Sequence, residues 1–421
     1  MANLADISFS LKEVVLPYIR DNFPKESILL DQMKRNVDVE QINDEFVAPV
    51  YTSRHGGVTN MANDGNNVNA ATGRVGSRGT VPVEIVSAAF NISKLAIDAS
   101  ASKNLAVESA LTSQANSLAI DFGRHVNRQL YGDGVGVITK ARATGGSAGA
   151  ALAAVETVDA SVDDGRVLDK YGTINSSGGV AEISPTKYVA NGQILGVGTA
   201  AAAVGTVSSY DGTSITFTAN TAIAANDAIY ILDGSGGGAG TSEFLGVGAA
   251  VSSTTGTSTY AGLARSTQGW TPQFGSANEA LTQKRMEDTY LAATEYASKT
   301  DKYIILVNKT LFGKYGQILT SMRRVVNESD LLGGWTGLEF AAGGSRVGVF
   351  LDYDVPDGEV IVLNLDTWTI TQVSEVDWME DPGGSLLRLE NQIRYQAVMV
   401  WFANVLCLAP AANGKQTRKT A

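Results

Sequence analysis

The sequence predicts an α+β fold that carries a small inserted all-β domain. Three features support this class: a long helical pattern over residues 102–131, a weakly charged and glycine-rich run of strands between residues 172 and 255, and mixed helices and strands after residue 279. Because helical and mixed patterns lie on both sides of the glycine-rich run, its strands are expected to form an insertion within a larger fold.

The first 52 residues are expected to form an N-terminal arm. Apolar residues recur at helical spacing from Ser10 to Asn22, with Pro17 at a position where a helix can kink, and strand-like segments follow. This segment has few turn signals, which would suit an arm that lies across a neighbouring chain. The pattern is equally compatible with a helix and a strand that pack on their own domain.

Residues 56–79 are expected to form the tip of a long two-stranded hairpin. This stretch of 24 residues holds six Gly and five Asn, and an alternating run of Val and Ile from Val81 to Val86 predicts the returning strand. Loops longer than about 12–15 residues are uncommon in compact domains, and an isolated hairpin is only marginally stable in water. The hairpin is therefore expected to be held by other chains.

The hairpin is basic, although the whole chain is acidic. Arg54, Arg74 and Arg78 stand against Asp64, which gives about two net positive charges near the tip of a chain whose formal net charge is −11. Complementary charge favours association between two surfaces. These four residues are the candidates for contacts between copies of the chain.

The strongest helical pattern runs from Ser102 to Tyr131. Its apolar residues recur every three or four positions, in the series Val107, Leu111, Ala115, Leu118, Phe122, Val126 and Leu130. At about 1.5 Å per residue this helix would be roughly 45 Å long. Gly132 and Gly134 follow and can adopt the left-handed backbone that often ends a helix.

The central insertion is predicted from composition and turn signals. Residues 172–255 include only six charged side chains, and two alternating runs flank Asp211-Gly212, the signature of a β-hairpin. A further strand is predicted over 228–232. The glycine-rich run at 234–240 is interpreted as a flexible loop and not as a phosphate-binding loop.

Helices are predicted over 279–299 and 310–321 in the last third of the chain. Residues 412–421, with Lys415, Arg418 and Lys419, are interpreted as a solvated basic tail. The predicted strands of this region are 302–307, 347–351, 360–363, 368–373, 386–389 and 395–408.

Composition excludes several classes of protein. A chain with 32 basic and 43 acidic residues is poorly suited to grip nucleic acid, but it can enclose nucleic acid without adhering to it. The single Cys407 lies in an apolar run and is interpreted as a core residue. The sequence shows neither a secretion signal nor a run of 18 apolar residues, which indicates a protein made and kept in a cytoplasm, without a membrane partner.

No catalytic residue is predicted. Residues 145–149 match the GxSxG pattern, but His55 and His125, the two histidines of the chain, both precede it, and no strand pattern leads into it. Residues 412–417 resemble part of a phosphate-binding loop, although Ala409 replaces the first glycine and Gln416 follows the lysine. The chain is therefore not expected to be an enzyme or to bind a cofactor.

No metal site is predicted either. Asp352, Asp354 and Asp357 partly match a calcium loop, but Pro356 disturbs their spacing and the Glu that would complete the loop is missing. A Pro-Asp-Gly turn between two strands explains these residues better. The pair Asp163-Asp164 is likewise interpreted as a solvated turn.

The order of these parts resembles the major capsid proteins of tailed bacteriophages, which have the HK97-like capsid fold. The similarity rests on SLKEVVLPYIRDNF, the 56–79 loop, the helix that ends in LYGDG, YAGLARSTQGWTP at 260–272, and the late segments VGVFLDYDVPDGEVIVLNLDTWTI and LLRLENQIRYQAVMVWFANVLCLAP. It covers nearly the whole chain except the β insertion. No single motif is diagnostic, but the colinear set is specific.

The resemblance implies five regions. They are an N-terminal arm at 1–52, an extended loop (E-loop) with its flanking strands at 53–95, a spine helix and peripheral domain at 96–160, the inserted β domain at 161–258, and an axial domain with returning peripheral strands and a C-terminal tail at 259–421.

The resemblance also implies a function. The chain would assemble with itself, as hexamers and pentamers, into an icosahedral capsid that encloses double-stranded DNA, through overlap of loops and arms, in the cytoplasm of a host bacterium. Implied partners are a portal protein, a separate scaffolding protein, because only about 55 residues precede the loop, and, as a further candidate, a decoration protein. Residues 56–79 include no Lys, so the Lys–Asn crosslink of some relatives is not expected here.

Two other functions stay open at this point. An encapsulin-like nanocompartment shell would have the same fold but enclose an enzyme, and nuclease-protected DNA in purified particles would distinguish it from a capsid. An acidic, glycine-rich enzyme is a more remote alternative, which a monomeric protein with hydrolytic activity would favour.

Overall fold

The computed structural model describes most of the chain in separate segments. These are residues 16–22, 28–36, 40–42, 44–52, 73–94, 104–134, 136–140, 151–156, 172–174, 180–183, 194–197, 203–210, 214–219, 228–231, 243–252, 259–267, 269–297, 302–321, 329–332, 335–342, 345–356, 358–380, 386–389 and 392–420. Within them the chain forms several sheets and a few helices, which confirms the predicted α+β class.

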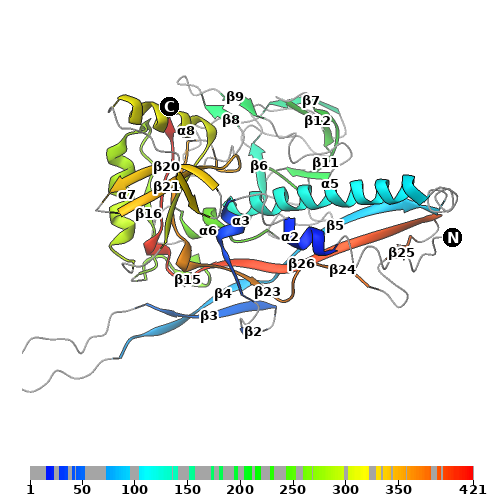
Figure 1. Ribbon diagram of the computed structural model, residues 1–421, viewed down its shortest axis with the longest axis horizontal. Coiled ribbons are helices and arrows are strands. Elements are labelled where there is room, and N and C mark those ends of the chain that lie inside the picture. Colours follow the sequence, from blue (N-terminus) through cyan, green and yellow to red (C-terminus); the bar gives the residue numbers. More distant parts are fainter. Residues whose placement is uncertain are drawn as a thin grey trace, which may run out of the picture.

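One long helix lies along one long sheet. The helix α5 (Asn104–Tyr131) is the predicted spine helix and runs beside β5 (Glu84–Ser93) and β26 (Arg394–Cys407) (Figure 1). These two strands pair antiparallel from Glu84 opposite Ala403 to Ser93 opposite Arg394. The other strands of this sheet are β1 (Lys34–Asn36), β23 (Trp368–Gln372), β24 (Asp377–Trp378) and β25 (Leu386–Arg388).

The apolar stripe of α5 faces this sheet. Phe122, Val126 and Leu130 follow one another at four-residue spacing and are all buried. The ring of Phe122 packs against Trp401 of β26, with 6.3 Å between ring centroids. The burial that the sequence periodicity predicts is thus confirmed over this half of the helix.

The N-terminal segment packs on the same core. Helix α2 (Leu16–Asn22) buries Leu16 and Ile19, helix α3 (Ile28–Gln32) buries Ile28, Leu29 and Leu30, and β1 pairs parallel with β23. For these residues the structure favours packing on the chain's own domain over lying across a neighbour. Helix α3 was not predicted, because five residues are too few to show a helical period.

A second core lies beneath a seven-stranded sheet. Helices α7 (Gln283–Thr294) and α8 (Lys309–Ser321) pack on it, and Tyr290, Tyr315 and Phe340 fill the space between. In spatial order its strands are β16 (Gln273–Gly275), β27 (Gly414–Gln416), β22 (Val360–Asn364), β18 (Tyr303–Val307), β21 (Ser345–Leu351), β20 (Trp335–Ala342) and β19 (Ser329–Leu332).

The described strands between residues 137 and 231 pair mostly with one another. The predicted hairpin around Asp211-Gly212 is present as β11 (Ala203–Tyr210) and β12 (Ser214–Ala219). The other strands of this sheet are β6 (Val137–Lys140), β13 (Ala228–Ile231), β10 (Ile194–Val197) and β7 (Ala151–Glu156), and β8 (Gly172–Ile174) pairs separately with β9 (Val180–Ile183). The sheet therefore includes two strands that precede residue 161, and the extent of an inserted domain stays a prediction.

The predicted hairpin is also present. Strand β3 (Glu45–Tyr51) pairs with β4 (Gly76–Pro82) in continuous register from Glu45 opposite Pro82 to Tyr51 opposite Gly76, and β2 (Glu40–Ile42) pairs with the outer edge of β3. The returning strand begins at Gly76, so residues 76–79 belong to a strand and not to the loop. Figure 1 shows this hairpin projecting from the body of the molecule.

The C-terminal segment corrects a prediction. Residues 412–420 are not a solvated tail, because β27 lies inside the seven-stranded sheet between β16 and β22, and β28 (Lys419–Thr420) pairs parallel with β17 (Glu279–Ala280). Lys415 and Lys419 are buried at 4% and 3% exposure. Lys415 pairs with the buried Glu359, and Lys419 pairs with the partly exposed Glu279 and with the Ala277 carbonyl, so neither lysine faces solvent.

The remaining elements are short. They are α6 (Val247–Ala250), β14 (Thr259–Tyr260), β15 (Leu263–Ala264), and the 3-10 turns η4 (Leu365–Thr367) and η5 (Pro410–Ala412). No helix in the described segments has the length and hydropathy needed to cross a membrane.

Candidate functional site: the projecting hairpin and its root

The hairpin formed by β3 and β4 is joined to the body at its root. Thr80 donates its amide hydrogen to Ala261 O at 3.0 Å, and Val83 donates to Asp44 O at 2.8 Å. Asp44 and Ala261 both have positive φ angles, 61° and 49°, a backbone conformation that is uncommon for residues other than glycine. The Ala261 carbonyl thus joins the hairpin to the body, whereas the Asp44 carbonyl extends the pairing of β3 and β4 by one residue.

The root is also closely packed. A Cβ atom at Gly79 would lie 3.2 Å from the side chain of Val50 and 3.9 Å from Ala261 Cβ. Phe46, Val50 and Val81 are buried on the same face of the hairpin. This apolar face of the hairpin is therefore covered by the chain itself.

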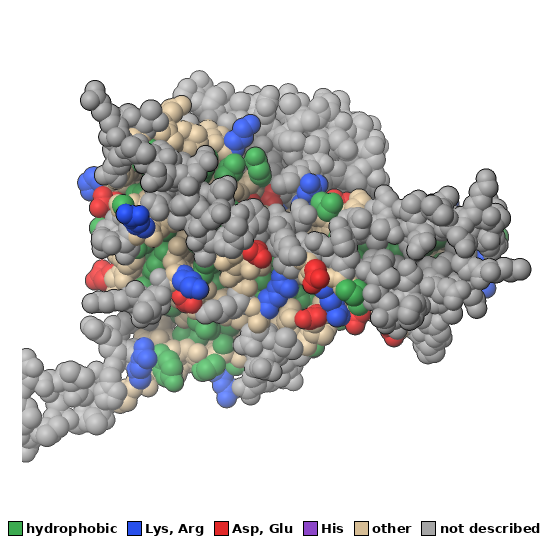
Figure 2. Space-filling model, in the orientation of Figure 1, with side chains coloured by type: hydrophobic (Ala, Val, Ile, Leu, Met, Phe, Trp, Pro, Cys, Tyr) green, Lys and Arg blue, Asp and Glu red, His purple; other side chains and the backbone are tan. Residues whose placement is uncertain are grey.

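The outer end of the hairpin is exposed. Tyr51 and Val75 have exposures of 61% and 59%. The guanidinium carbon of Arg74 lies 4.7 Å from the centroid of the Tyr51 ring, within the range of a cation–π contact. Figure 2 shows hydrophobic and basic side chains side by side over the described part of the hairpin. The surface is partly apolar and partly cationic.

Two of the four predicted contact residues lie on this surface. Arg78 is exposed on β4 opposite Pro49 of β3, and Arg74 lies beside Tyr51. Arg54 and Asp64 lie outside the described residues, as does His55. Sequence reasoning missed Tyr51 as a member of this group, because only the strand register shows that it ends opposite Gly76 and next to Arg74. Contact of these residues with another chain stays a prediction.

An ion pair between α5 and the segment before α6 lies close to the hairpin root. The guanidinium of Arg128 donates to both carboxylate oxygens of Glu243, with 3.0 Å from Nη1 to Oε2. Both residues are buried. Asn404 of β26 accepts a hydrogen bond from Leu245 N at 2.9 Å, so this segment is held to the long sheet as well.

Glu84 lies at the point where the hairpin turns into the long sheet. It is the first residue of β5 and follows Val83, the single residue that separates β4 from β5. Burial, with a smaller effect from the negative charge of Glu243, raises the pKa of Glu84 to about 7. A carboxyl group at the hinge of the hairpin therefore titrates near neutral pH.

A second acidic group contacts residues of α5 that neighbour Arg128. Asn127 donates from Nδ2 to Asp354 Oδ2 at 2.5 Å and to Asp352 Oδ1 at 3.3 Å, and the Tyr131 hydroxyl donates to Asp352 Oδ2 at 2.9 Å. Burial and the neighbouring Asp354 raise the pKa of Asp352 to about 6. The predicted turn is present, but its two aspartates are buried against α5 and do not face solvent.

The described residues offer little for catalysis or metal binding. Nowhere in them do three His, Cys, Asp or Glu side chains gather as a metal site would require, and burial raises the pKa of the Cys407 thiol to about 12, so this thiol stays protonated at neutral pH. His125 Nε2 lies 2.9 Å from Gln129 Nε2. The GxSxG match, Asp163-Asp164, Asp357 and the 234–240 glycines lie outside the described residues.

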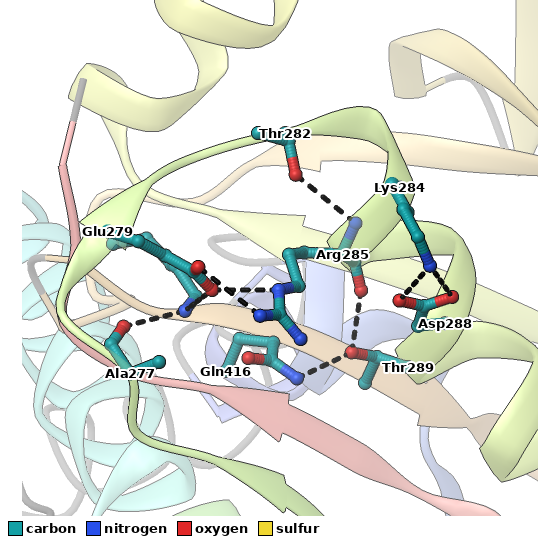
Figure 3. Close-up of polar contacts among 9 residues, drawn as sticks. Ala277, Glu279, Thr282, Lys284, Arg285, Asp288, Thr289 and Gln416 are labelled. Atoms are coloured by element: carbon teal, nitrogen blue, oxygen red, sulfur yellow. Dashed lines mark hydrogen bonds and ion pairs between the residues drawn. The ribbon is translucent and has the colours of Figure 1, made fainter.

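A polar network fixes the C-terminal segment to α7. Lys419 donates to Ala277 O at 2.7 Å and to Glu279 Oε1 at 2.9 Å, and Arg285 also pairs with Glu279 (Figure 3). Gln416 donates to the Thr289 hydroxyl at 2.7 Å. The hydrogen bond and charge of Lys419 lower the pKa of Glu279. These contacts hold the C-terminal segment against β17 and α7.

No family model matches the sequence, and no curated protein matches it. Among solved structures, the capsid of cyanophage A-1(L) is similar at 14% identity, with 92% of each chain covered and a TM-score of 0.49. The capsid of an empty GTA particle is similar at 11% identity, over 93% of this chain and 89% of that one, with a TM-score of 0.48.

An encapsulin complex from Synechococcus elongatus is similar over a smaller part. It covers 35% of this chain and 53% of the encapsulin chain, at 12% identity and a TM-score of 0.28. The similar structures that span most of the chain also include the capsid of Myoviridae phage XM1 and a procapsid of satellite phage P4.

Proposed function

We propose that this chain is the structural subunit of an icosahedral capsid that encloses double-stranded DNA, and that it assembles through overlap between neighbouring copies. The observation that carries this proposal is the projecting hairpin. The outer end of its described part presents exposed Tyr51 and Val75 beside a stacked arginine. At this end, beyond the strand β2 and the buried root, the hairpin has two strands, which gain stability from packing on another surface. A second copy of the chain supplies such a surface.

The charge balance supports the same arrangement. The outer end of the described hairpin carries Arg74 and Arg78, with Glu45 at its root, whereas the whole chain has a formal net charge of −11. A basic hairpin that lies on an acidic neighbour gains from complementary charge. Each copy both presents a hairpin and receives one, so contacts that are individually weak are multiplied around a closed shell.

An acidic wall also suits a container for DNA. Affinity for nucleic acid depends mainly on Lys and Arg that neutralise phosphates, and a net negative chain encloses the polymer without binding it by sequence. In this proposal the copies form hexamers and pentamers in the cytoplasm of a host bacterium, with a separate scaffolding protein and a portal protein as partners and a decoration protein as a further candidate.

Electron microscopy of the expressed full chain tests the proposal. Discrete closed particles, alone or on coexpression with a scaffolding protein, are expected. Monomers that persist at high concentration under both conditions would contradict it. Nuclease treatment of particles from infected cells then distinguishes the contents: protected DNA supports a capsid, and particles filled with an enzyme would indicate a nanocompartment.

A further inference from the structure

The last turn of α5 is contacted from two directions by buried acidic side chains. On one side Glu243 pairs with Arg128, and Glu84, the first residue of β5, lies close enough to Glu243 for the two negative charges to interact. Asp352 and Asp354, from the turn between β21 and β22, lie on the other side and contact Asn127 and Tyr131. This single helical turn therefore joins the hairpin root and the seven-stranded sheet.

We propose that residues 125–131 form a proton-sensitive joint, in which loss of a proton from Glu84 and from Asp352 loosens the contacts of α5 with the hairpin root and with the β21–β22 turn.

The geometry of the aspartate pair supports this joint. Oxygens of both carboxyl groups lie within 3.3 Å of one atom, Asn127 Nδ2, and both residues are buried at 7% and 2% exposure. Burial of the site and the nearby charge of Asp354 therefore favour retention of the proton on Asp352. When that proton leaves, two adjacent carboxylates repel each other at the surface where the turn meets the helix.

Ionisation of Glu84 acts in the same direction as ionisation of Asp352. Glu84 is 9% exposed, and the carboxylate of the neighbouring Glu243 pairs with the guanidinium of Arg128, with 3.0 Å from Nη1 to Oε2. Ionised Glu84 adds a buried negative charge next to that ion pair, at the residue where the hairpin begins to diverge from the long sheet. Asn404, which is paired with this region through Pro82 O and Leu245 N, supplies no charge to offset it.

The sign of the pH dependence follows from these shifts. The folded chain binds protons at Asp352 and Glu84 that the unfolded chain has released, so their contribution to stability is complete below about pH 4 and is lost as the pH rises toward about 7. His125 acts in the opposite sense, because burial and the nearby Arg128 lower the pKa of His125 to about 4. The test therefore compares variants that all keep His125.

Thermal unfolding of the full chain between pH 4.5 and 7.5 tests the joint. Asp352→Asn and Glu84→Gln imitate the protonated groups. Between pH 4.5 and 7.5 the melting temperature of each variant is expected to fall by about 2–4 °C less than that of the unchanged protein. The matched control is Asp288→Asn, whose carboxylate is exposed and pairs with Lys284; its pH dependence should equal that of the unchanged chain.

Hydrogen exchange locates the effect. After correction for the intrinsic exchange rate, amides of residues 125–131 should exchange faster at pH 7.5 than at pH 5 in the unchanged chain, and equally at both values in the double variant Asp352→Asn, Glu84→Gln. Equal pH dependence in the double variant and the unchanged chain would overturn the joint. If Asp352→Asn does not fold, Asp354→Asn removes the like charge instead and should flatten the profile in the same direction.

The joint is a property of the single chain. Its test needs no particle, so a chain that fails to assemble would contradict the capsid proposal and leave this inference standing.

Discussion

Asn404 donates a hydrogen bond from Nδ2 to the carbonyl oxygen of Pro82 at 2.7 Å, and this contact ties the end of the hairpin to the longest strand of the molecule. The same side chain accepts hydrogen bonds from Leu245 N and Val405 N at 2.9 and 2.7 Å. One amide thus satisfies backbone groups of three separate segments. The hydrogen bond to Pro82 therefore fixes the place where the projecting hairpin leaves the body of the molecule.

Replacement of Asn404 by Ala is expected to destabilise the fold by about 2–4 kcal/mol. The substitution leaves Pro82 O and Leu245 N without their partner, and each unsatisfied buried polar group costs about 1–3 kcal/mol. Denaturant unfolding measures this loss, and hydrogen exchange should show it first at Leu245. Asn91→Ala, at an exposed position of β5, is the matched control and should change stability by less than about 0.5 kcal/mol.

The buried pair of Lys415 and Glu359 gives a second prediction. Lys415 Nζ lies 2.8 Å from Glu359 Oε1, and the two side chains have exposures of 5% and 2%. Lys415→Met alone should cost about 3–5 kcal/mol, because it leaves a buried charge without its partner, whereas Lys415→Met with Glu359→Leu should recover most of this loss.

Equilibrium unfolding of the single and double variants measures this coupling. Lys284→Met, which removes an exposed ion pair with Asp288, serves as the control and should cost at most about 0.5 kcal/mol. A single Lys415 variant as stable as the unchanged chain would show that the C-terminal strand does not depend on the pair.

The sequence predicted the elements that have a clear period of their own. The stripe through Phe122, Val126 and Leu130 predicted α5 to within two residues at its start. The strand predicted over 395–408 is β26 (Arg394–Cys407), so its ends differ by one residue each. The predicted helix over 279–299 was too long, because Glu279 and Ala280 pair with β28 and α7 begins at Gln283 after its cap Thr282. Local signals gave the type of element better than its ends.

Contacts between distant residues could not be predicted in this way. Lys415 looked solvated because nothing in the local pattern indicates Glu359, which is 56 positions earlier. Asp352 and Asp354 looked like residues of an exposed turn because their partners Asn127 and Tyr131 are on another element. For the hairpin, the charges of Arg74 and Arg78 were visible in the sequence, but the position of Tyr51 beside them required the register of β3 and β4.

Cys407 is expected to be unreactive in the folded chain. It is fully buried, and burial raises the pKa of its thiol to about 12, so little thiolate is present at neutral pH. A chromogenic disulfide reagent at pH 7.5 should modify less than about a tenth of the protein within an hour in buffer and all of it in denaturant. Rapid modification in buffer would show that the core around β26 opens readily.

The charge of the hairpin gives the last prediction. Arg74→Glu together with Arg78→Glu reverses the basic surface beside Tyr51, so it should reduce the yield of closed particles at least about tenfold while the melting temperature of the isolated subunit stays within about 2 °C. The physical reason is that each reversed charge then faces a neighbour of the same sign, and like charges across an interface cost several kcal/mol.

Lys309→Glu with Lys314→Glu is the matched control, since it changes the net charge by the same amount on α8, away from the hairpin. Light scattering and electron microscopy at low and high salt measure assembly. Because screening shortens the range of electrostatic interactions to about 3 Å at 1 M salt, high salt should partly restore assembly of the hairpin variant. Unchanged assembly of that variant at low salt would show that the arginines do not contribute to the contact between subunits.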